Sequence, residues 1–120
     1  MEIINNTLSL GIDIGSVSIA YVLLNNENKI VSSDYRIHSG NILDCLRESL
    51  KTLDWPGITH VGYNQKSTEF FTCGIPVNDQ RALVEGMKSE SRAVRSLFTI
   101  GGETFGLILF DQDQNYQKYM

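Results

Sequence analysis

The chain has 120 residues, of which 42% are hydrophobic and 20% are charged, so it has the composition of an ordinary globular domain. Its net charge of -4 argues against a protein that binds nucleic acid through a concentrated basic face. No apolar run approaches the ~18 residues that span a bilayer, and the first residues do not resemble a secretory signal. We therefore expect a soluble, cytoplasmic protein without a nucleic-acid or membrane partner.

Three strands are predicted in the first third of the chain. Leucine and isoleucine occupy every second position of residues 8–14, which is typical of a strand with one buried face. Residues 19–24 are almost all apolar, and residues 29–38 alternate again, with their apolar side chains at odd positions. The asparagine-rich residues 25–28 supply the turn between the last two strands, because asparagine tolerates a positive φ. The pattern predicts an antiparallel three-stranded meander.

Helices and short strands alternate in the rest of the chain. The pattern predicts a helix over 42–53, a strand over 58–63, a loop with a helical turn over 64–71, a strand over 71–75, a helix over 78–94 and strands over 97–100 and 104–110. We expect an α/β domain with a mixed sheet in residues 1–95. Residues 96–120 are expected to hold the first strand pair of a second domain.

Residues 10–18 carry the main functional signal. Asp13 lies near the end of the first predicted strand, and Gly15 and Ser16 follow at the turn. A carboxylate in a buried strand is costly unless hydrogen bonds or a cation stabilise its charge. A small-residue turn brings backbone N–H groups close to phosphate oxygens, and the carboxylate can hold Mg²⁺ directly or through water. The alternative is a buried aspartate that only stabilises the turn, and the pattern does not decide between the two.

Two motifs resemble a known family. Residues 11–16, Gly-Ile-Asp-Ile-Gly-Ser, resemble the first phosphate motif of the acetate kinase, sugar kinase, Hsp70 and actin superfamily. Residues 99–104, Thr-Ile-Gly-Gly-Glu-Thr, resemble the second phosphate motif of the BadF/BadG/BcrA/BcrD-type ATPases, which include activators of 2-hydroxyacyl-CoA dehydratases. The resemblance covers nearly the whole chain but half or less of a family member, so we expect an N-terminal fragment.

The resemblance implies a ribonuclease-H-like, actin-like ATPase fold that binds ATP or ADP with Mg²⁺ between two domains. It implies a CoA-ester dehydratase or reductase as partner, and the unpaired edge of the last strand pair leaves a homodimer open. The nucleotide-binding residues that it implies are Gly11, Asp13, Gly15, Ser16, Val17, Ser18, Gly101, Gly102 and Glu103, with Asp13 as the magnesium ligand.

Family members share a [4Fe-4S] cluster between two subunits, and the resemblance places the cluster cysteines beyond residue 120. Cys45 and Cys73 match no cluster position and have no CxxC spacing, so we expect both to be small buried residues.

The chain departs from the family at the second motif, where Thr99 and Thr104 replace two aspartates. A neutral hydroxyl cannot replace a carboxylate in holding Mg²⁺ or orienting an attacking water. Whether the chain belongs to an active ATPase therefore stays open, and the alternative is a degenerate, non-hydrolysing interaction or scaffold domain. A ribonuclease-H-like nuclease is disfavoured, because it needs several carboxylates around two metals and only Asp13 is suitably placed.

Other residues that can bind ligands have simpler explanations. His38 and His60 lack metal-ligand spacing and are expected at the surface or at strand ends. Tyr63, Phe70 and Phe71 are expected to pack in the core rather than to stack on a base.

Overall fold

The computed structural model describes residues 7–89, 93–101, 105–113 and 115–119. The chain forms two compact units, Met1–Val77 and Asn78–Met120, and each is described here by itself. Within the described ranges, the helices are too short or too polar to cross a membrane.

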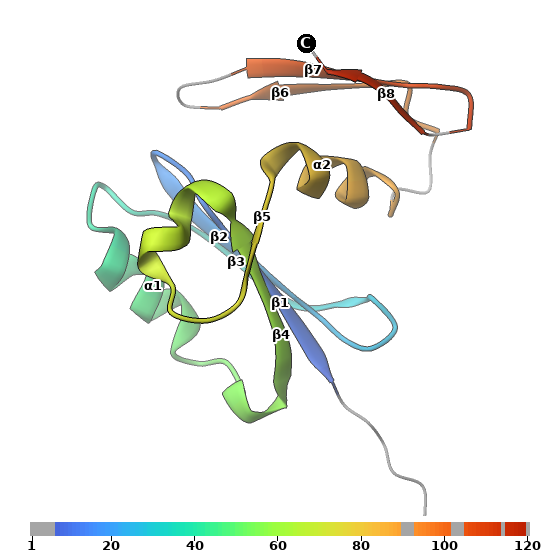
Figure 1. Ribbon diagram of the computed structural model, residues 1–120. Helices are drawn as coiled ribbons and strands as arrows, with labels where there is room; N and C mark the ends of the chain where they lie inside the picture. Colours follow the sequence, from blue (N-terminus) through green and yellow to red (C-terminus); the bar gives the residue numbers. More distant parts are fainter. Residues whose placement is uncertain (1–6, 90–92, 102–104, 114, 120) are drawn as a thin grey trace, which may run out of the picture. The chain divides into compact units, whose positions relative to one another are not determined.

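The first unit is built on a mixed five-stranded sheet with the strand order β3-β2-β1-β4-β5 (Figure 1). Neighbours are antiparallel from β3 to β1, whereas β4 runs parallel to both β1 and β5. The strands are β1 Leu8–Ile14, β2 Ser18–Leu24, β3 Ile30–Ile37, β4 Ile58–Asn64 and β5 Ile75–Val77. The predicted meander is confirmed, and Asn28 in its second turn has a φ of 61°.

One face of this sheet carries the core of the unit. Helix α1 (Ile42–Leu50) and the 3-10 helix η2 (Gln65–Phe70) lie on that face (Figure 1), and a second 3-10 helix, η1 (Trp55–Gly57), leads into β4. The buried side chains are the alternate residues of β1 and β2 together with one each from α1 and β4: Leu10, Ile12, Ile14, Ile19, Tyr21, Leu23, Leu46 and Tyr63. The ring of Tyr63 stacks on Phe71 with a centroid distance of 4.1 Å, so the aromatic segment packs in the core as expected.

The edge strand β3 turns its apolar side to the surface. Val31, Tyr35 and Ile37 are 51%, 65% and 57% exposed. The polar side of the strand is the less exposed one, because Asp34 pairs with the core residue Tyr21 of β2. Asp34 accepts hydrogen bonds from Ser49 of α1 at 2.9 Å and from the Arg36 guanidinium at 2.6 Å. These bonds give the Asp34 carboxylate hydrogen-bond donors beside α1.

The second unit pairs helix α2 with a three-stranded antiparallel sheet of order β6-β7-β8. Its elements are α2 Asp79–Met87, β6 Ser96–Ile100, β7 Phe105–Phe110 and β8 Tyr116–Tyr119. The expected strand pair therefore has a third member, because β8 adds to the free edge of β7. The predicted helix is also shorter: it begins at the side-chain cap of Asn78, as expected, but ends at Met87 rather than near residue 94.

The division between the units falls earlier than the expected domain boundary after residue 95. Met87 and Val84 of α2 pack with the buried Ile108 and Phe110 of β7, so the helix shares a core with the second sheet. The boundary at residue 95 stays a prediction for a longer protein.

We expect Ile19→Ala to destabilise the first unit by about 2–5 kcal/mol, because it leaves a cavity in a packed core. The Ile19 side chain is 1% exposed, whereas that of Ile30 on the edge strand is 66% exposed. Ile30→Ala is thus the matched control and should cost about 0.5 kcal/mol or less. Chemical denaturation of both variants measures the difference, and equal losses would contradict the assigned core.

The Asp34 carboxylate predicts an acid-sensitive contribution to stability. The hydrogen bond from Arg36, and then that from Ser49, lowers the pKa of Asp34 below its ordinary value. The folded state therefore binds this proton less readily than the unfolded chain, and the stabilisation present at neutral pH is lost as the pH falls through the lowered pKa. The difference in unfolding free energy between wild type and Asp34→Asn should shrink in that acid range. Glu27→Gln, which removes an exposed ion pair with Lys29, is the control.

Candidate functional site

The candidate site is the turn of residues 15–17 that joins β1 to β2. Gly15, Ser16 and Val17 are exposed there, directly after the buried Ile14. The predicted residues of the first motif from Asp13 to Ser18 thus lie together at the carboxyl end of β1. This location follows from chain order, but the hydrogen bonds that shape the turn come from other strands.

Asn64 holds the end of β1 from the neighbouring parallel strand. The Ile14 N–H donates to Asn64 Oδ1 at 2.9 Å, and Asn64 Nδ2 donates to the Ile14 carbonyl at 2.9 Å. The hydroxyl of Ser67, buried in η2, donates to the same carbonyl at 3.4 Å. Because β1 and β4 are parallel, their carboxyl ends meet at one edge, which brings Asn64 to Ile14. The side-chain amide of Asn64 continues the ladder one step beyond the paired residues.

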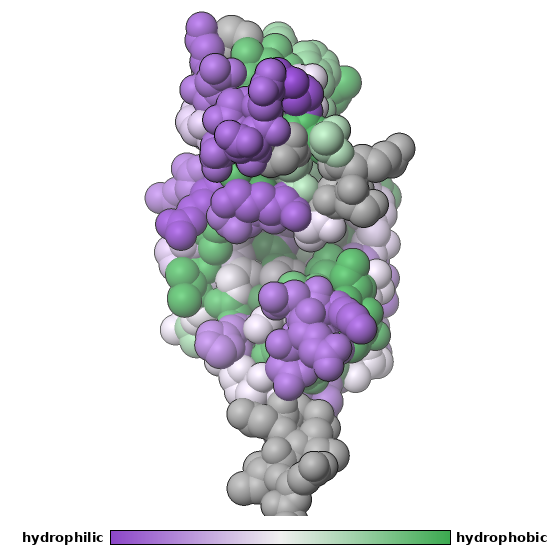
Figure 2. All heavy atoms as spheres, turned by 90° about the vertical axis from the view of Figure 1, so that its right-hand side faces the viewer, coloured by the Kyte–Doolittle hydropathy of each residue, from purple (hydrophilic) through white to green (hydrophobic). Residues whose placement is uncertain are grey.

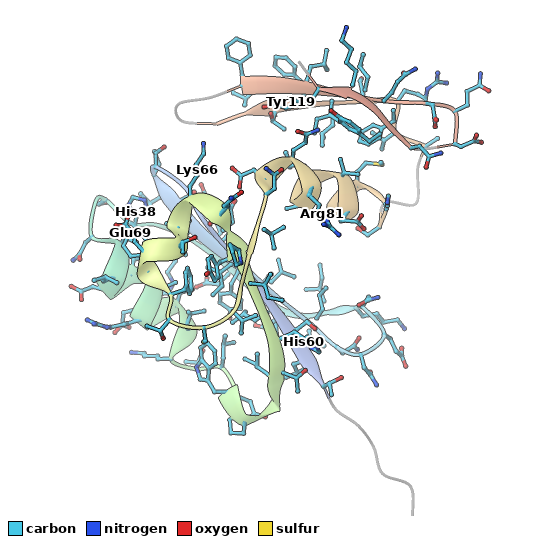
Figure 3. The ribbon with its side chains drawn as sticks, viewed as in Figure 1. His38, His60, Lys66, Glu69, Arg81 and Tyr119 are labelled. Atoms are coloured by element: carbon cyan, nitrogen blue, oxygen red, sulfur yellow. The ribbon has the colours of Figure 1, made fainter. Side chains whose placement is uncertain are left out.

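His38 holds the next peptide group of the turn. Its Nδ1 lies 3.0 Å from the Gly40 N–H, and its Nε2 lies 2.9 Å from the Gly15 carbonyl. A backbone N–H can only donate and a carbonyl can only accept, so we assign the proton to Nε2. The His38 N–H also donates to the Val17 carbonyl at 3.0 Å, and the side chain is 5% exposed. Figure 3 shows His38 at the turn and His60 near the opposite end of the sheet.

These bonds occupy carbonyls at and beside the turn. The carbonyls of Ile14, Gly15, Val17 and Ser18 all accept hydrogen bonds, the last from the Gly15 N–H at 2.8 Å. Among the described residues, no hydrogen bond uses the N–H of Ser16 or of Val17. Consecutive exposed N–H groups at a turn form a concavity of partial positive charge, which binds anions such as phosphate.

Asp13 lies on the exposed face of β1, opposite Ile12 and Ile14, so the expectation of a buried carboxylate is wrong. The strict alternation of β1 places odd residues away from α1. Within the described ranges, no three His, Cys, Asp or Glu residues are placed to hold a metal ion. Mg²⁺ in nucleotide sites is commonly held by one or two carboxylates together with the phosphates, so a single carboxylate such as that of Asp13 is compatible with that arrangement.

Lys66 is a basic residue near the turn that the sequence analysis missed. It lies in η2 between Asn64 and Ser67, the two residues that bind Ile14, and its side chain is exposed (Figure 3). It takes part in no ion pair with any described residue.

The second motif belongs to the second unit. Gly101 follows β6 and is exposed, whereas Gly102, Glu103 and Thr104 lie outside the described residues. Thr99 is half-buried in β6, where its hydroxyl donates to the Gly106 carbonyl at 3.3 Å. The described part of this motif therefore shows an ordinary strand end.

Two further expectations concern Gly11 and the cysteines. Gly11 is exposed on the same face as Asp13 and pairs with Gly62 of β4. Both cysteines are free, but only Cys45 packs against the core, and the expectation that Cys73 is buried is wrong. Cys73 precedes Gly74 in the loop before β5, and Gly74 has a φ of 98°.

The sequence matches no protein-family model and no curated protein. Solved structures do match. The activator of the 2-hydroxyisocaproyl-CoA dehydratase from Clostridium difficile, with bound ADPNP, superposes with a TM-score of 0.78 at 17% identity, over 95% of this chain and 45% of that one. Component A of the (R)-2-hydroxyglutaryl-CoA dehydratase from Acidaminococcus fermentans superposes with a TM-score of 0.74 at 15% identity, over 94% of this chain and 46% of that one. The Aquifex aeolicus Ppx/GppA phosphatase, in its type II variant, superposes with a TM-score of 0.56 at 13% identity, over 95% of this chain and 51% of that one.

The chain has the actin-like ATPase fold. The fold that the sequence resemblance implied is thus confirmed. The chain spans less than half the length of the dehydratase activator and of the dehydratase component A that it matches. In this actin-like ATPase fold, the turn after β1 carries the first of the two motifs singled out from the sequence.

We expect Asn64→Ala to lower the unfolding free energy of the first unit by about 1–3 kcal/mol, because the buried Ile14 N–H loses its partner. Asn64→Asp keeps the acceptor but sets a carboxylate against the Ile14 carbonyl, so it should also destabilise. Asn41→Ala is the control, since among the described residues the Asn41 side chain bonds only the exposed side chain of Asp44, at 3.0 Å. Asn41→Ala should lower the unfolding free energy by about 0.5 kcal/mol or less. Denaturant unfolding measures all three, and a harmless Asn64→Ala would contradict the assigned role.

Proposed function

We propose that the chain binds the phosphates of ATP or ADP at the turn of residues 15–18. The observation that carries the proposal is the state of the turn's polar groups. The carbonyls of Ile14, Gly15, Val17 and Ser18 accept hydrogen bonds, whereas the N–H groups of the exposed residues Ser16 and Val17 donate to no described residue. The hydroxyls of Ser16 and Ser18 add donors at the same place, and Lys66 adds a positive charge nearby. Each of these groups favours an anion.

The class of anion is supported by the fold and by Asp13. The Clostridium difficile activator, which shares the fold, is described with bound ADPNP. The Asp13 carboxylate carries a negative charge that repels phosphate, so it favours a ligand that arrives with a divalent cation. Mg²⁺ bound between Asp13 and the phosphates would supply charge neutralisation, while the turn orients the phosphate oxygens through its N–H groups.

We further propose that the chain is the N-terminal nucleotide-binding part of an activator of a 2-hydroxyacyl-CoA dehydratase, in which the second motif, residues 99–104, also binds phosphate. Both activator structures that it matches are about twice as long as this chain. A CoA-ester dehydratase component would then be the partner of the whole protein.

A non-hydrolysing interaction domain is the second candidate, favoured by Thr99. The Thr99 hydroxyl bonds the Gly106 carbonyl and is a neutral group where the resembled family has an aspartate. Under this alternative the chain can bind nucleotide but does not turn it over.

Nucleotide binding can be tested on the chain itself by NMR. We expect Mg-ADPNP to shift the amide signals of Ser16 and Val17 first, with a Kd on the order of 1 mM, because half of the ligand would remain in water. Asp13→Asn should weaken binding when Mg²⁺ is present but not when it is absent, since the carboxylate acts through the cation. Asp54→Asn, directly before η1, is the control and should change neither affinity.

Two results would contradict the proposal. One is the absence of any shift at residues 15–18 with several millimolar Mg-ADPNP, and the other is an Asp13→Asn effect that is the same with and without Mg²⁺. Release of phosphate from Mg-ATP by the chain, lost in Asp13→Asn, would exclude the non-hydrolysing alternative.

A further inference from the structure

His38 is a buried titratable group to which the proposed function assigns no task. All of its polar atoms are occupied: its N–H bonds the Val17 carbonyl, its carbonyl accepts from the Asn41 N–H at 2.8 Å, and its two ring nitrogens bond Gly40 and Gly15. Two of these bonds go to the turn of residues 15–17. A histidine whose only task was to fill space would not need this set of partners.

We infer that His38 is a positioning residue for the phosphate-binding turn, an inference that rests on the proposed nucleotide site. Its neutral ring, protonated at Nε2, holds the Gly15 carbonyl and so keeps the Ser16 N–H directed at the ligand. His38 itself does not contact the ligand in this arrangement.

The geometry of the peptide group makes this link. The Gly15 carbonyl and the Ser16 N–H belong to one planar, trans peptide, in which C=O and N–H point in opposite directions. A donor that binds the carbonyl on the protein side therefore directs the N–H to the solvent side. Glycine permits a wide range of φ and ψ, so without this bond the peptide after Gly15 can rotate and present its carbonyl to the phosphate.

A pair of near-isosteric variants separates the two ring nitrogens. In His38→Gln the side-chain NH₂ reaches about as far as Nε2, so the donor to Gly15 is kept and the acceptor for Gly40 is lost. In His38→Asn the side-chain oxygen lies near the place of Nδ1, so the acceptor for Gly40 is kept and the donor to Gly15 is lost. Each variant lacks one hydrogen bond of the His38 ring. If His38 contributed only to stability, the two variants should therefore bind nucleotide with similar affinity.

The inference predicts different nucleotide affinities. We expect His38→Asn to raise the Kd for Mg-ADPNP roughly tenfold, the equivalent of one charge-assisted hydrogen bond, and His38→Gln to raise it by less than about threefold. His60→Asn is the control, because His60 is exposed and its ring bonds the Thr59 side chain. Thermal unfolding of each variant reports on stability, and the ¹⁵N spectrum of the imidazole ring shows which nitrogen carries the proton.

Each result is decisive. If wild type binds Mg-ADPNP and His38→Asn binds equally well, the inference is wrong while the proposed function stands. If wild type does not bind, the proposed function is wrong and the inference falls with it. If His38→Asn does not fold, His38→Gln and the ring spectrum decide: weak binding by a folded His38→Gln, or a proton on Nδ1 of the wild type, overturns the inference.

Discussion

The first unit depends on the bond between two parallel strands at the point where β1 stops. Asn64 gives Ile14 both a donor and an acceptor, so the backbone of β1 stays satisfied where the regular ladder has ended. A buried N–H without a partner would otherwise cost as much as a lost hydrogen bond. With Ile14 held in this way, the chain leaves the sheet at Gly15 in a defined direction, and His38 can reach the following carbonyl. The packing of β1 in the core and the conformation of the turn after it therefore depend on the same hydrogen bonds.

The proposed phosphate-binding turn relies on backbone groups more than on charged residues. The carbonyls of Ile14, Gly15, Val17 and Ser18, which would repel phosphate, accept hydrogen bonds from Asn64, Ser67, His38 and the turn's own backbone. The exposed N–H groups then cost nothing in the absence of ligand, because water can bond them. In the proposed site, Asp13 on the exposed face of β1 adds a negative charge that a cation would bridge to a phosphate, so the proposal favours a phosphate that carries Mg²⁺.

Local patterns predicted most of the fold. Strict alternation in residues 8–14 identified β1 and its buried face, and Asn78 marked the start of α2. The third strand of the second sheet was not identified, because the four residues Tyr116–Tyr119 are all exposed and show no alternation. The orientation of β3 was also not readable, since its apolar face is the exposed one and Asp34 is satisfied by Ser49, fifteen residues away. The candidate site was predicted as far as it lies in one segment. Asn64 and His38 join it only through the sheet, although the position of Asn64 at the end of a strand parallel to β1 is a signal that could have been used.

The exposed apolar side of β3 has a consequence for handling the protein in solution. An edge strand with exposed isoleucine, valine and tyrosine side chains can pair with another extended chain, because it offers both backbone hydrogen-bonding groups and apolar surface. Hydrophobic (green) patches appear among hydrophilic (purple) ones on the surface in Figure 2. The small negative net charge gives little long-range repulsion at physiological salt. This strand is therefore one place where copies of the chain can associate at high concentration, and a lysine in place of Val31 would oppose that association without changing the core or the turn.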